Sequence, residues 1–327
     1  MARNATNTLL QKAKKQKSDE FYTLLPDIES ELKHYTNHFQ GKVVYCNCDD
    51  PRTSNFYRYF AVNFHQLGLQ GLIAACYREV HRDLFDMDAG ESGFYYIYTG
   101  ADDENMIPVD DDLIYFNGDG DFRSQESIGL LMKADIVVTN PPFSLFREYV
   151  AQLIRHERKF LIIGNINAIT YKEIFHLIKE NKVWLGVNLG RGISGFLVPE
   201  HYELYGTEAR IDEKGNRIIS PNNCLWLTNM DNVKRNEKIL LTKRYVGNES
   251  AYQRYDNYDG INVDKTQDIP MDYAGYMGVP ITFLHKFNPN QFEIIKFRKG
   301  DDDKDLSING KCPYFRILIR NRQIAQF

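Results

Sequence analysis

Residues 134–165 read ADIVVTNPPFSLFREYVAQLIRHERKFLIIGN, and this stretch decides the fold class. It begins and ends with short runs of Val, Ile, Leu and Phe, which are typical of fully buried strands. Between them, FREYVAQLIRHE places apolar residues at helical spacing. A strand, a helix and a second strand in this order predict a βαβ unit with parallel strands in a sheet that is covered on both faces. The sequence therefore predicts an α/β protein.

The same alternation continues on both sides of this stretch. We expect further strands in KVVYCNC, GLIAACYRE, GFYYIYTG and KVWLGVNLG, and further helices in DIESELKHYTNHF, SNFYRYFAVNFHQLG, ESIGLLMKA and TYKEIFHLIKEN. These segments predict a doubly wound, mostly parallel sheet. After about Asn229 the alternation stops, and short segments rich in Tyr, Asn, Lys and Arg follow. We therefore expect a basic N-terminal arm over residues 1–19, an α/β domain over 20–229 and a smaller C-terminal region over 230–327.

The composition restricts the class of protein further. Of the 327 residues, 43% are hydrophobic and 26% are charged, as in ordinary globular proteins. No apolar run is long enough to span a membrane, and the first residues lack the apolar segment of a secretion signal. The cysteines are five in number and scattered. We therefore expect a reducing, cytoplasmic location with free thiols.

The formal net charge of −4 comes from one segment of the chain. Residues 83–121 contain 12 acidic residues and no Lys or Arg. The rest of the chain therefore contains 32 acidic and 40 basic residues. Because salt screens charges beyond ~8–10 Å, a basic face can attract phosphate whatever the total charge is. We expect the acidic segment to be a solvated loop region, and the total charge does not exclude a nucleic-acid substrate.

Asn140-Pro141-Pro142-Phe143 directly follows the first strand of the opening stretch. Ligands of open parallel sheets bind at the carboxyl ends of the strands, so chemistry is expected there. The tetrapeptide suits methylation of an exocyclic amine such as N6 of adenine. The Asn140 side-chain oxygen and the Pro141 carbonyl each accept one amine hydrogen, the prolines fix the backbone in advance, and Phe143 offers a face for the base. The alternative is a turn that only ends the strand.

The tetrapeptide is similar to the [DNS]-P-P-[FYW] motif of S-adenosylmethionine-dependent amino-methyltransferases, in the form typical of N6-adenine enzymes. The rest of the chain resembles the EcoRI-type adenine-specific DNA methyltransferases, the modification methylases of type II restriction–modification systems. The resemblance is carried by MARNATN at residues 1–7, KSDEFYT at 17–23, VVYCNCDDP at 43–51, GDGDFRS at 118–124, DIVVTNPPFSLFREY at 135–149 and GKCPYFRILI at 310–319.

This resemblance implies a Rossmann-like fold with a C-terminal DNA-recognition region, and S-adenosyl-L-methionine as the cofactor. The implied partner is double-stranded DNA, from which an adenine is flipped. The implied target is a short palindrome such as GAATTC, and the implied active form is a monomer without a metal ion or a membrane. The residues Asn140, Pro141, Pro142 and Phe143 take the catalytic role.

The resemblance also implies where the methionine end of the cofactor binds. Tyr22 and Thr23 match the segment that closes over it, for which the alternative is an aromatic helix staple. Cys46, Asp49 and Asp50 match the first strand-to-helix turn, in which one of the two aspartates pairs with the α-ammonium group. The glycine-rich F-x-G-x-G of related methyltransferases is missing there. The two cysteines of CNC have no partners at zinc spacing, so we expect no zinc site.

The adenosine end is assigned to residues farther along the chain. Glu79 follows the second strand, where acidic residues bind ribose hydroxyls, and Tyr77 packs on the adenosine. Asp121 and Phe122 resemble the pair that binds the adenine ring, and Asn140 borders the cofactor. The alternatives are a solvated helix cap for Glu79 and an Asp-Gly-rich loop for Asp121 and Phe122.

Candidate DNA contacts lie at both ends of the chain. Lys14 and Lys15 belong to the N-terminal arm, for which a solvated terminus is the alternative. The C-terminal candidates are cations interleaved with Tyr245, Tyr252 and Tyr255, namely Lys234, Arg235, Lys238, Lys243, Arg244 and Arg254, followed by a second cluster of Arg316, Arg320 and Arg322. Lys and Arg fix the register on phosphates, whereas Arg and Asn read base edges. For any single cation, a solvated surface charge is the alternative.

Trp226 is a candidate second wall for the flipped base, and the alternative, which we favour, is a core tryptophan. Two other functions stay open. The first is an S-adenosylmethionine-dependent methyltransferase that acts on RNA or on protein glutamine, because such enzymes share N-P-P-[FY]. The second is a DNA-binding protein that has lost catalysis, which the intact tetrapeptide argues against.

Overall fold

The computed structural model describes residues 22–78, 92–101, 106–188, 193–198, 204, 209–213, 215–219, 223–312 and 314–324. The chain divides into two compact units. The first comprises residues 1–168 and 186–230, and the second comprises residues 169–185 and 231–327. One boundary thus lies close to the change in sequence texture at Asn229, and the second unit also takes in a helix from the middle of the chain.

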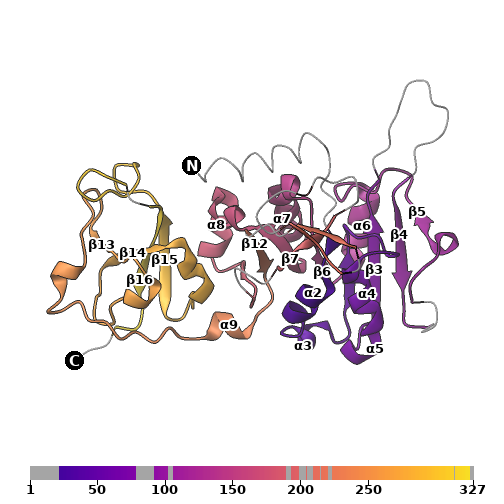
Figure 1. Ribbon diagram of the computed structural model, residues 1–327, viewed down its shortest axis with the longest axis horizontal. Helices are drawn as coiled ribbons and strands as arrows, with labels where there is room; N and C mark the ends of the chain where they lie inside the picture. Colours follow the sequence, from indigo (N-terminus) through magenta and orange to yellow (C-terminus); the bar gives the residue numbers. More distant parts are fainter. Residues whose placement is uncertain are drawn as a thin grey trace, which may run out of the picture. The chain divides into compact units, whose positions relative to one another are not determined.

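The first unit alternates strands and helices along most of its length (Figure 1). Its strands are β1 (Tyr22–Thr23), β2 (Val43–Cys46), β3 (Gly71–Cys76), β4 (Phe94–Tyr98), β5 (Ile114–Tyr115), β6 (Ile136–Thr139), β7 (Lys159–Asn165), β9 (Phe196–Leu197), β10 (Arg210–Ile211), β11 (Arg217–Ile219) and β12 (Cys224–Thr228). Its helices are α2 (Leu25–Leu32), α3 (Thr36–Phe39), α4 (Asn55–Val62), α5 (Phe64–Leu67), α6 (Gln125–Lys133) and α7 (Phe146–Arg155), with 3₁₀ turns η1 (Asp110–Asp112) and η2 (Phe143–Leu145).

The strands of the larger sheet in this unit follow the order β5-β4-β3-β2-β6-β7-β12. β2 pairs in parallel with β3 and β6, and β6 pairs in parallel with β7. β4, β5 and β12 join in antiparallel pairs. The expectation of a mostly parallel sheet is therefore correct for the centre and wrong for the edges, so the sheet is mixed. β12 is buried along its whole length, so its sequence is as continuously apolar as that of a parallel strand.

Both faces of the parallel centre are buried. Val44 and Cys46 of β2 belong to one core cluster together with Ile28 of α2 and Phe56 of α4. Tyr45 lies between them in a strand whose side chains alternate, so it faces the other side, and it is equally buried. This arrangement explains why the strands read as continuous apolar runs.

Polar caps fix where the helices of this unit begin. The Ser54 hydroxyl oxygen accepts hydrogen bonds from the backbone N–H of Phe56 (3.1 Å) and of Tyr57 (3.3 Å), which starts α4. The Ser124 hydroxyl accepts one from Ser127 N–H (3.1 Å), which starts α6. Each cap therefore also fixes the end of the loop that precedes its helix.

A small antiparallel sheet accompanies the larger one in the first unit. Its strand order is β1-β9-β11-β10, and Thr23 lies opposite Phe196. The sequence did not predict this sheet, because strands of two or three residues carry no periodic signal.

The second unit contains a separate four-stranded sheet, in the order β13-β14-β16-β15. β13 pairs in parallel with β14, and β16 pairs in antiparallel fashion with both β14 and β15. Phe175 of α8 packs on Phe297 of β15, with 5.1 Å between the ring centroids. The elements are α8 (Lys172–Lys179), β8 (Trp184–Leu185), α9 (Val233–Asn236), β13 (Gly260–Asn262), β14 (Tyr276–Pro280), β15 (Phe292–Phe297) and β16 (Arg316–Asn321), with 3₁₀ turns η4 (Glu249–Ala251), η5 (Thr266–Asp268) and η6 (Ile281–Lys286). The sequence did not predict this sheet either.

Trp226 lies on β12, a strand that the sequence analysis missed. Its side chain is completely buried, and its ring packs edge-on against Phe56, with 6.0 Å between the centroids. The core interpretation of this tryptophan is therefore confirmed, and Trp226 is not a wall for a flipped base.

We expect Trp226→Ala to lower the free energy of unfolding by about 3–5 kcal/mol, because it removes a large buried ring and leaves a cavity. Urea denaturation followed by circular dichroism measures this. Val62→Ala, at a side chain that is 63% exposed, is the control and stays within about 0.5 kcal/mol of the wild type. A loss below about 1 kcal/mol for Trp226→Ala would contradict its core position.

Candidate active site

The Asn140–Phe143 tetrapeptide forms a corner at the carboxyl end of β6. Both neighbours of β6 in the sheet, β2 and β7, run parallel to it, so the same edge collects their carboxyl ends. Pro142 has φ −60° and ψ 121° and leads through η2 directly into α7. Pro141 is buried, whereas Asn140, Pro142 and Phe143 are half-buried. The corner is therefore partly accessible at Pro142 and Phe143, although the Asn140 side-chain oxygen is itself buried.

Phe143 is supported from the small sheet. Its ring contacts the edge of Phe196, with 6.5 Å between the centroids and 70° between the planes. Phe196 lies opposite Thr23 in the sheet, and the Thr23 carbonyl accepts a hydrogen bond from the Asn55 side chain at the start of α4 (2.8 Å). The predicted cofactor residues Tyr22 and Thr23 are thus held beside the corner.

Asp49 connects three segments of the site. Its backbone N–H donates to the Ala75 carbonyl at the end of β3 (2.8 Å). One carboxylate oxygen accepts from the Ser54 hydroxyl (2.6 Å), and the other accepts a short hydrogen bond from the Thr139 hydroxyl. Since Thr139 directly precedes Asn140, this carboxylate fixes the corner relative to the turn after β2.

The burial of the Asp49 carboxylate changes its pKa. Burial raises its pKa to about 6, although the bonds from Ser54 and Thr139 act in the opposite direction. Asp50, the other candidate for the α-ammonium group, is bound by the Arg52 guanidinium at 2.6 Å, and Arg52 also pairs with Asp110. Asp50 Oδ1 already accepts two hydrogen bonds from Arg52, whereas Asp50 Oδ2 and both Asp49 oxygens accept one each. Because a carboxylate oxygen can accept two, both aspartates keep capacity for a ligand.

A second tie joins the turn after β2 to α7. The buried Tyr149 hydroxyl donates a very short hydrogen bond to the Asn47 side-chain oxygen, and the Cys48 thiol lies 3.8 Å from the same oxygen. Burial raises the pKa of the Cys46 and Cys48 thiols far above their ordinary value, so both stay protonated at neutral pH. The predicted contact residue Cys46 is completely buried at the end of β2.

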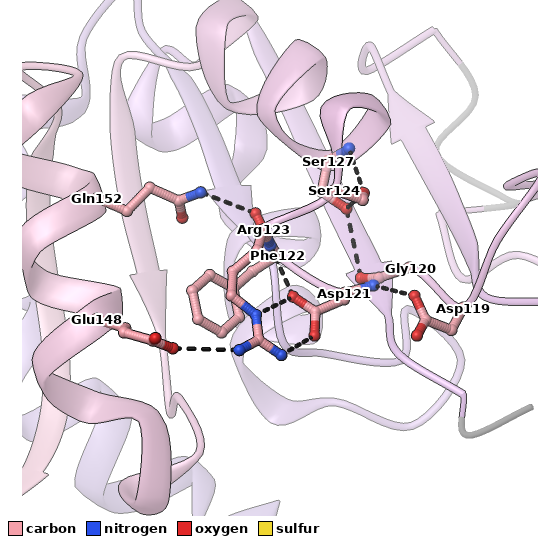
Figure 2. Close-up of polar contacts among 9 residues, drawn as sticks. All are labelled: Asp119, Gly120, Asp121, Phe122, Arg123, Ser124, Ser127, Glu148 and Gln152. Carbon is pink, nitrogen blue, oxygen red and sulfur yellow. Dashed lines mark hydrogen bonds and ion pairs between the residues drawn. The ribbon is translucent and has the colours of Figure 1, made fainter.

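The same helix anchors the loop that carries Asp121 and Phe122 (Figure 2). The Gln152 side chain of α7 donates to the Phe122 carbonyl (2.9 Å), and the Ser127 hydroxyl of α6 donates to the Gly120 carbonyl (3.3 Å). The Phe122 ring is buried edge-on against Tyr149, with 5.1 Å between the centroids. Tyr149 therefore contacts both the turn after β2 and this loop.

The Asp121 carboxylate is bound by Arg123, as Figure 2 shows. Burial opposes its ionisation, but the bonds from the Arg123 side chain and backbone outweigh burial and lower its pKa. Arg123 also reaches Glu148 of α7 at 3.2 Å. Asp121 is thus charged at neutral pH and is held by a guanidinium that is itself half-exposed.

The end of β3 lies against this loop. Gly120 has φ +77°, and a side-chain carbon there would come within 2.9 Å of the Cys76 carbonyl, so glycine allows the close approach. Arg78 N–H donates to the Asp119 carbonyl (2.9 Å), and the Tyr77 side chain is 49% exposed. Tyr77 therefore presents an accessible ring on the segment that packs against Asp119 and Gly120. Glu79, Lys14 and Lys15 lie outside the described residues.

The structure thus brings the predicted residues of the first unit that it describes together at the carboxyl edge of the sheet. The sequence missed the side chains that hold them, Ser54, Thr139, Tyr149, Gln152 and Phe196. A serine directly before a helix was a detectable capping signal. The other four occupy ordinary core or helix positions, and only their tertiary contacts single them out.

The predicted DNA-binding cations of the second unit differ in their surroundings. Lys234 pairs with Glu237 at 2.7 Å. The Arg235 guanidinium lies 3.3 Å from the Trp184 ring centroid, and burial lowers its pKa. Arg254 is exposed beside Asp259, whereas Lys238, Lys243 and Arg244 are exposed on one segment.

Two of the three arginines in the second predicted cluster, Arg316 and Arg320, are held in ion pairs, whereas Arg322 is exposed. Arg316 is 5% exposed, pairs with Asp264 at 2.9 Å and donates to Asn262 at 3.0 Å. Arg320 pairs with Glu293 at 2.6 Å. The sequence could not distinguish these roles, because an arginine in a short strand has the same composition signal whether it is buried or exposed.

Within the described ranges, no group of three or more His, Cys, Asp and Glu side chains could hold a metal ion. In the same part of the chain, no helix has the length and apolar character needed to cross a membrane.

Comparison with known proteins agrees with the chemistry of the corner. Residues 9–322 match the family model described as adenine-specific methyltransferase EcoRI. The chain belongs to this family. It is 68% identical over 326 residues to the type II methyltransferase M.EcoRI of Escherichia coli, and the match covers 100% of both chains.

More distant relatives show the same full-length similarity. The chain is 36% identical over 330 residues to the type II methyltransferase M.MpnI of Mycoplasma pneumoniae, with 95% of this chain and 98% of that protein covered. It is also 36% identical over 332 residues to M.MgeORF184P of Mycoplasma genitalium, with 96% and 98% covered. No solved structure matches the chain.

The buried carboxylate predicts a specific pH dependence of stability. Because folding raises the pKa of Asp49 from 3.8 to about 6, the folded chain keeps a proton that the unfolded chain loses near pH 4. The contribution of Asp49 to the free energy of unfolding therefore falls by about 3 kcal/mol as pH rises from about 4 to about 6, and it is constant above that range.

We expect Asp49→Asn to lack this contribution, so that the unfolding free energy of the wild type relative to that of the variant falls by about 3 kcal/mol over the same range. Urea titrations of both proteins in steps from pH 4 to 7 measure the difference. Parallel pH profiles would contradict the raised pKa.

Proposed function

We propose that this chain transfers the sulfonium methyl group of S-adenosyl-L-methionine to N6 of an adenine that is flipped out of duplex DNA. The observation that carries the proposal is the half-buried Asn140–Phe143 corner at the carboxyl edge of the sheet, tied to Asp49 through Thr139. Membership of an adenine-specific methyltransferase family supports the same chemistry.

The residues beside the corner fit the proposed cofactor. Tyr77 offers an exposed aromatic face, and Asp121 offers a charged carboxylate for the adenine amine. Asp49 and Asp50 supply carboxylates for the α-ammonium group. Glu79 is assigned to the ribose. When bound, the cofactor supplies an electrophilic methyl group on a positively charged sulfur.

The corner activates the amine by geometry. The lone pair of N6 is delocalised into the purine ring, so the amine is a weak nucleophile. When the Asn140 side-chain oxygen and the Pro141 carbonyl each accept one N6 hydrogen, the nitrogen becomes more tetrahedral and its lone pair turns to the methyl carbon. The N–C bond forms as the C–S bond breaks, and one N6 proton then leaves to water.

Base flipping is needed because a stacked adenine cannot bring N6 to the corner. Extrusion costs a few kcal/mol, which stacking on Phe143 partly offsets. The edge of Phe196 supports that ring from behind.

We assign the first unit to catalysis, as a doubly wound, Rossmann-like methyltransferase domain, and the second unit to DNA recognition. The parallel centre with both faces covered supports the first assignment. The Escherichia coli relative is named a type II methyltransferase, which supports a modification enzyme of a type II restriction–modification system. The target that we propose is GAATTC, as the resemblance implies. We further propose that the protein acts as a monomer in the cytoplasm, with Lys14, Lys15, Lys234, Arg235, Lys243, Arg244 and Arg254 as candidate DNA contacts.

The substrate is tested by incubating the protein with radiolabelled S-adenosylmethionine and plasmid DNA, cellular RNA or a protein extract. We expect label on plasmid DNA as N6-methyladenine, and resistance of that DNA to the endonuclease that cuts GAATTC. Label on RNA or protein alone would contradict the proposal. DNA binding without any label would point to a protein that has lost catalysis.

Asn140→Ala tests the amine clamp. We expect it to lower the single-turnover methylation rate at least ~100-fold, as loss of one preorganised acceptor does at other sites of developing charge, while dissociation constants for cofactor and DNA change little. Asn37→Ala, at an exposed position of α3, is the matched control and keeps the wild-type rate. Near wild-type methylation by Asn140→Ala would remove the clamp from the mechanism.

A further inference from the structure

The chain after α9 forms an extended segment whose side chains alternate in exposure. Figure 1 draws it in orange, and we call residues 238–246 the strap. Lys238, Leu240 and Thr242 are exposed, whereas Ile239 and Leu241 between them are half-buried. A period of two is the signature of an extended chain with one side turned outward.

Buried amides fix the first half of the strap. The Gln291 side chain, which is 6% exposed, donates to the Ile239 carbonyl and accepts from the Ile239 N–H, both at 2.8 Å. The Asn288 side chain donates to the carbonyls of Asn236 and Glu237 at 3.0 and 3.2 Å. Because these side-chain amides are buried, their hydrogen bonds to the extended backbone hold it in one register.

The second half of the strap is fixed in the same way. Met271 N–H donates to the Lys243 carbonyl at 2.9 Å. The Asp272 carboxylate accepts from Tyr245 N–H at 2.6 Å and from Val246 N–H at 3.2 Å. Between these two anchored regions, the backbone of the second unit presents residues 240–242 to solvent.

The exposed side chains of the strap are one large apolar side chain, Leu240, and several cations. Leu240 is 85% exposed, and no large apolar side chain that the structure describes is more exposed. A single exposed leucine would need no explanation. On this strap, however, it lies on an anchored backbone among Lys238, Lys243 and Arg244, and residues 238–246 contain no acid.

Another surface of the second unit is unsuitable for phosphate. An open hollow of about 590 Å³ is lined by Asp256, Asp259, Asp301 and Asp302, with Arg254 at its margin paired to Asp259. Its negative charge repels a nucleic acid backbone. Charge complementarity therefore favours the strap as the DNA-facing element of this unit.

We propose that the strap lies in the major groove of duplex DNA, where Leu240 contacts a thymine methyl group and Lys243 contacts a phosphate. The proposal rests on the proposed function, because it needs duplex DNA as the substrate. Thymine exposes its methyl group only in the major groove, and an apolar side chain there distinguishes thymine from the other bases. The anchored backbone makes this contact without an ordering cost at the moment of binding.

The test uses two short duplexes that contain GAATTC, one with thymine and one with uracil in place of every thymine. We expect wild-type protein to bind the uracil duplex about three- to fivefold more weakly, as loss of a buried methyl contact predicts. Leu240→Ala should bind the thymine duplex more weakly by a similar factor and lose little more on the uracil duplex. The four dissociation constants form a double-mutant cycle, which cancels general effects of uracil on DNA shape.

Val62→Ala, an exposed apolar position of α4, is the control and should respond to uracil as the wild type does. In a salt titration, Lys243→Ala should reduce the slope of log K against log [salt] by about one, as expected for one lost phosphate contact. Equal sensitivity of wild type and Leu240→Ala to uracil, or an unchanged salt slope for Lys243→Ala, would overturn the placement of the strap.

Methylation of plasmid DNA by the wild type is measured in parallel. If the wild type methylates GAATTC and the cycle shows no coupling, the strap proposal fails and the proposed function stands. If the wild type methylates no DNA, the proposed function itself fails.

Discussion

The hydrogen bond from the Thr139 hydroxyl to the buried Asp49 carboxylate is the constraint on which the site depends. It joins the last residue of β6 to the turn after β2, and the bond from Ser54 to the same carboxylate extends the connection to the start of α4. A buried carboxylate is costly, as its raised pKa shows, and two hydroxyl donors offset part of that cost. What the fold gains is an Asn140 whose backbone cannot move independently of the turn that we assign to the cofactor.

Buried side chains also form hydrogen bonds to other segments to which we assign a function. Tyr149 and Gln152 of α7 bind Asn47 and the Phe122 carbonyl, so one helix aligns the turn after β2 with the loop that carries Asp121. In the second unit, the buried amides of Asn288 and Gln291 hold the strap. In each case a buried polar side chain is paired with the backbone or side chain of a loop, because leaving it without a partner would cost more than ordering the loop.

The sequence predicted the parts of this protein that have local signals. The buried strands around Val44 and Val137, the helix from Phe146 and the position of Asn140 after a strand all followed from periodicity and turn chemistry. The strand β12, the small sheet around Phe196 and the sheet of the second unit did not, because strand pairing depends on contacts between distant segments. The interpretation of Arg316 as a DNA-binding cation was also based on charge alone, and Arg316 is a buried ion-pair partner. Composition gives the number of cations, whereas only packing shows which of them are exposed to solvent.

The central claim is that the corner accepts both hydrogens of an adenine amine. It is tested most directly by giving the protein and its methyl donor a duplex whose target base already carries one N6 methyl group, and by analysing the nucleosides with mass spectrometry. The account predicts no N6,N6-dimethyladenine, because only one hydrogen is left for two acceptors. Dimethylation at a rate comparable with that of the first methyl transfer would contradict it.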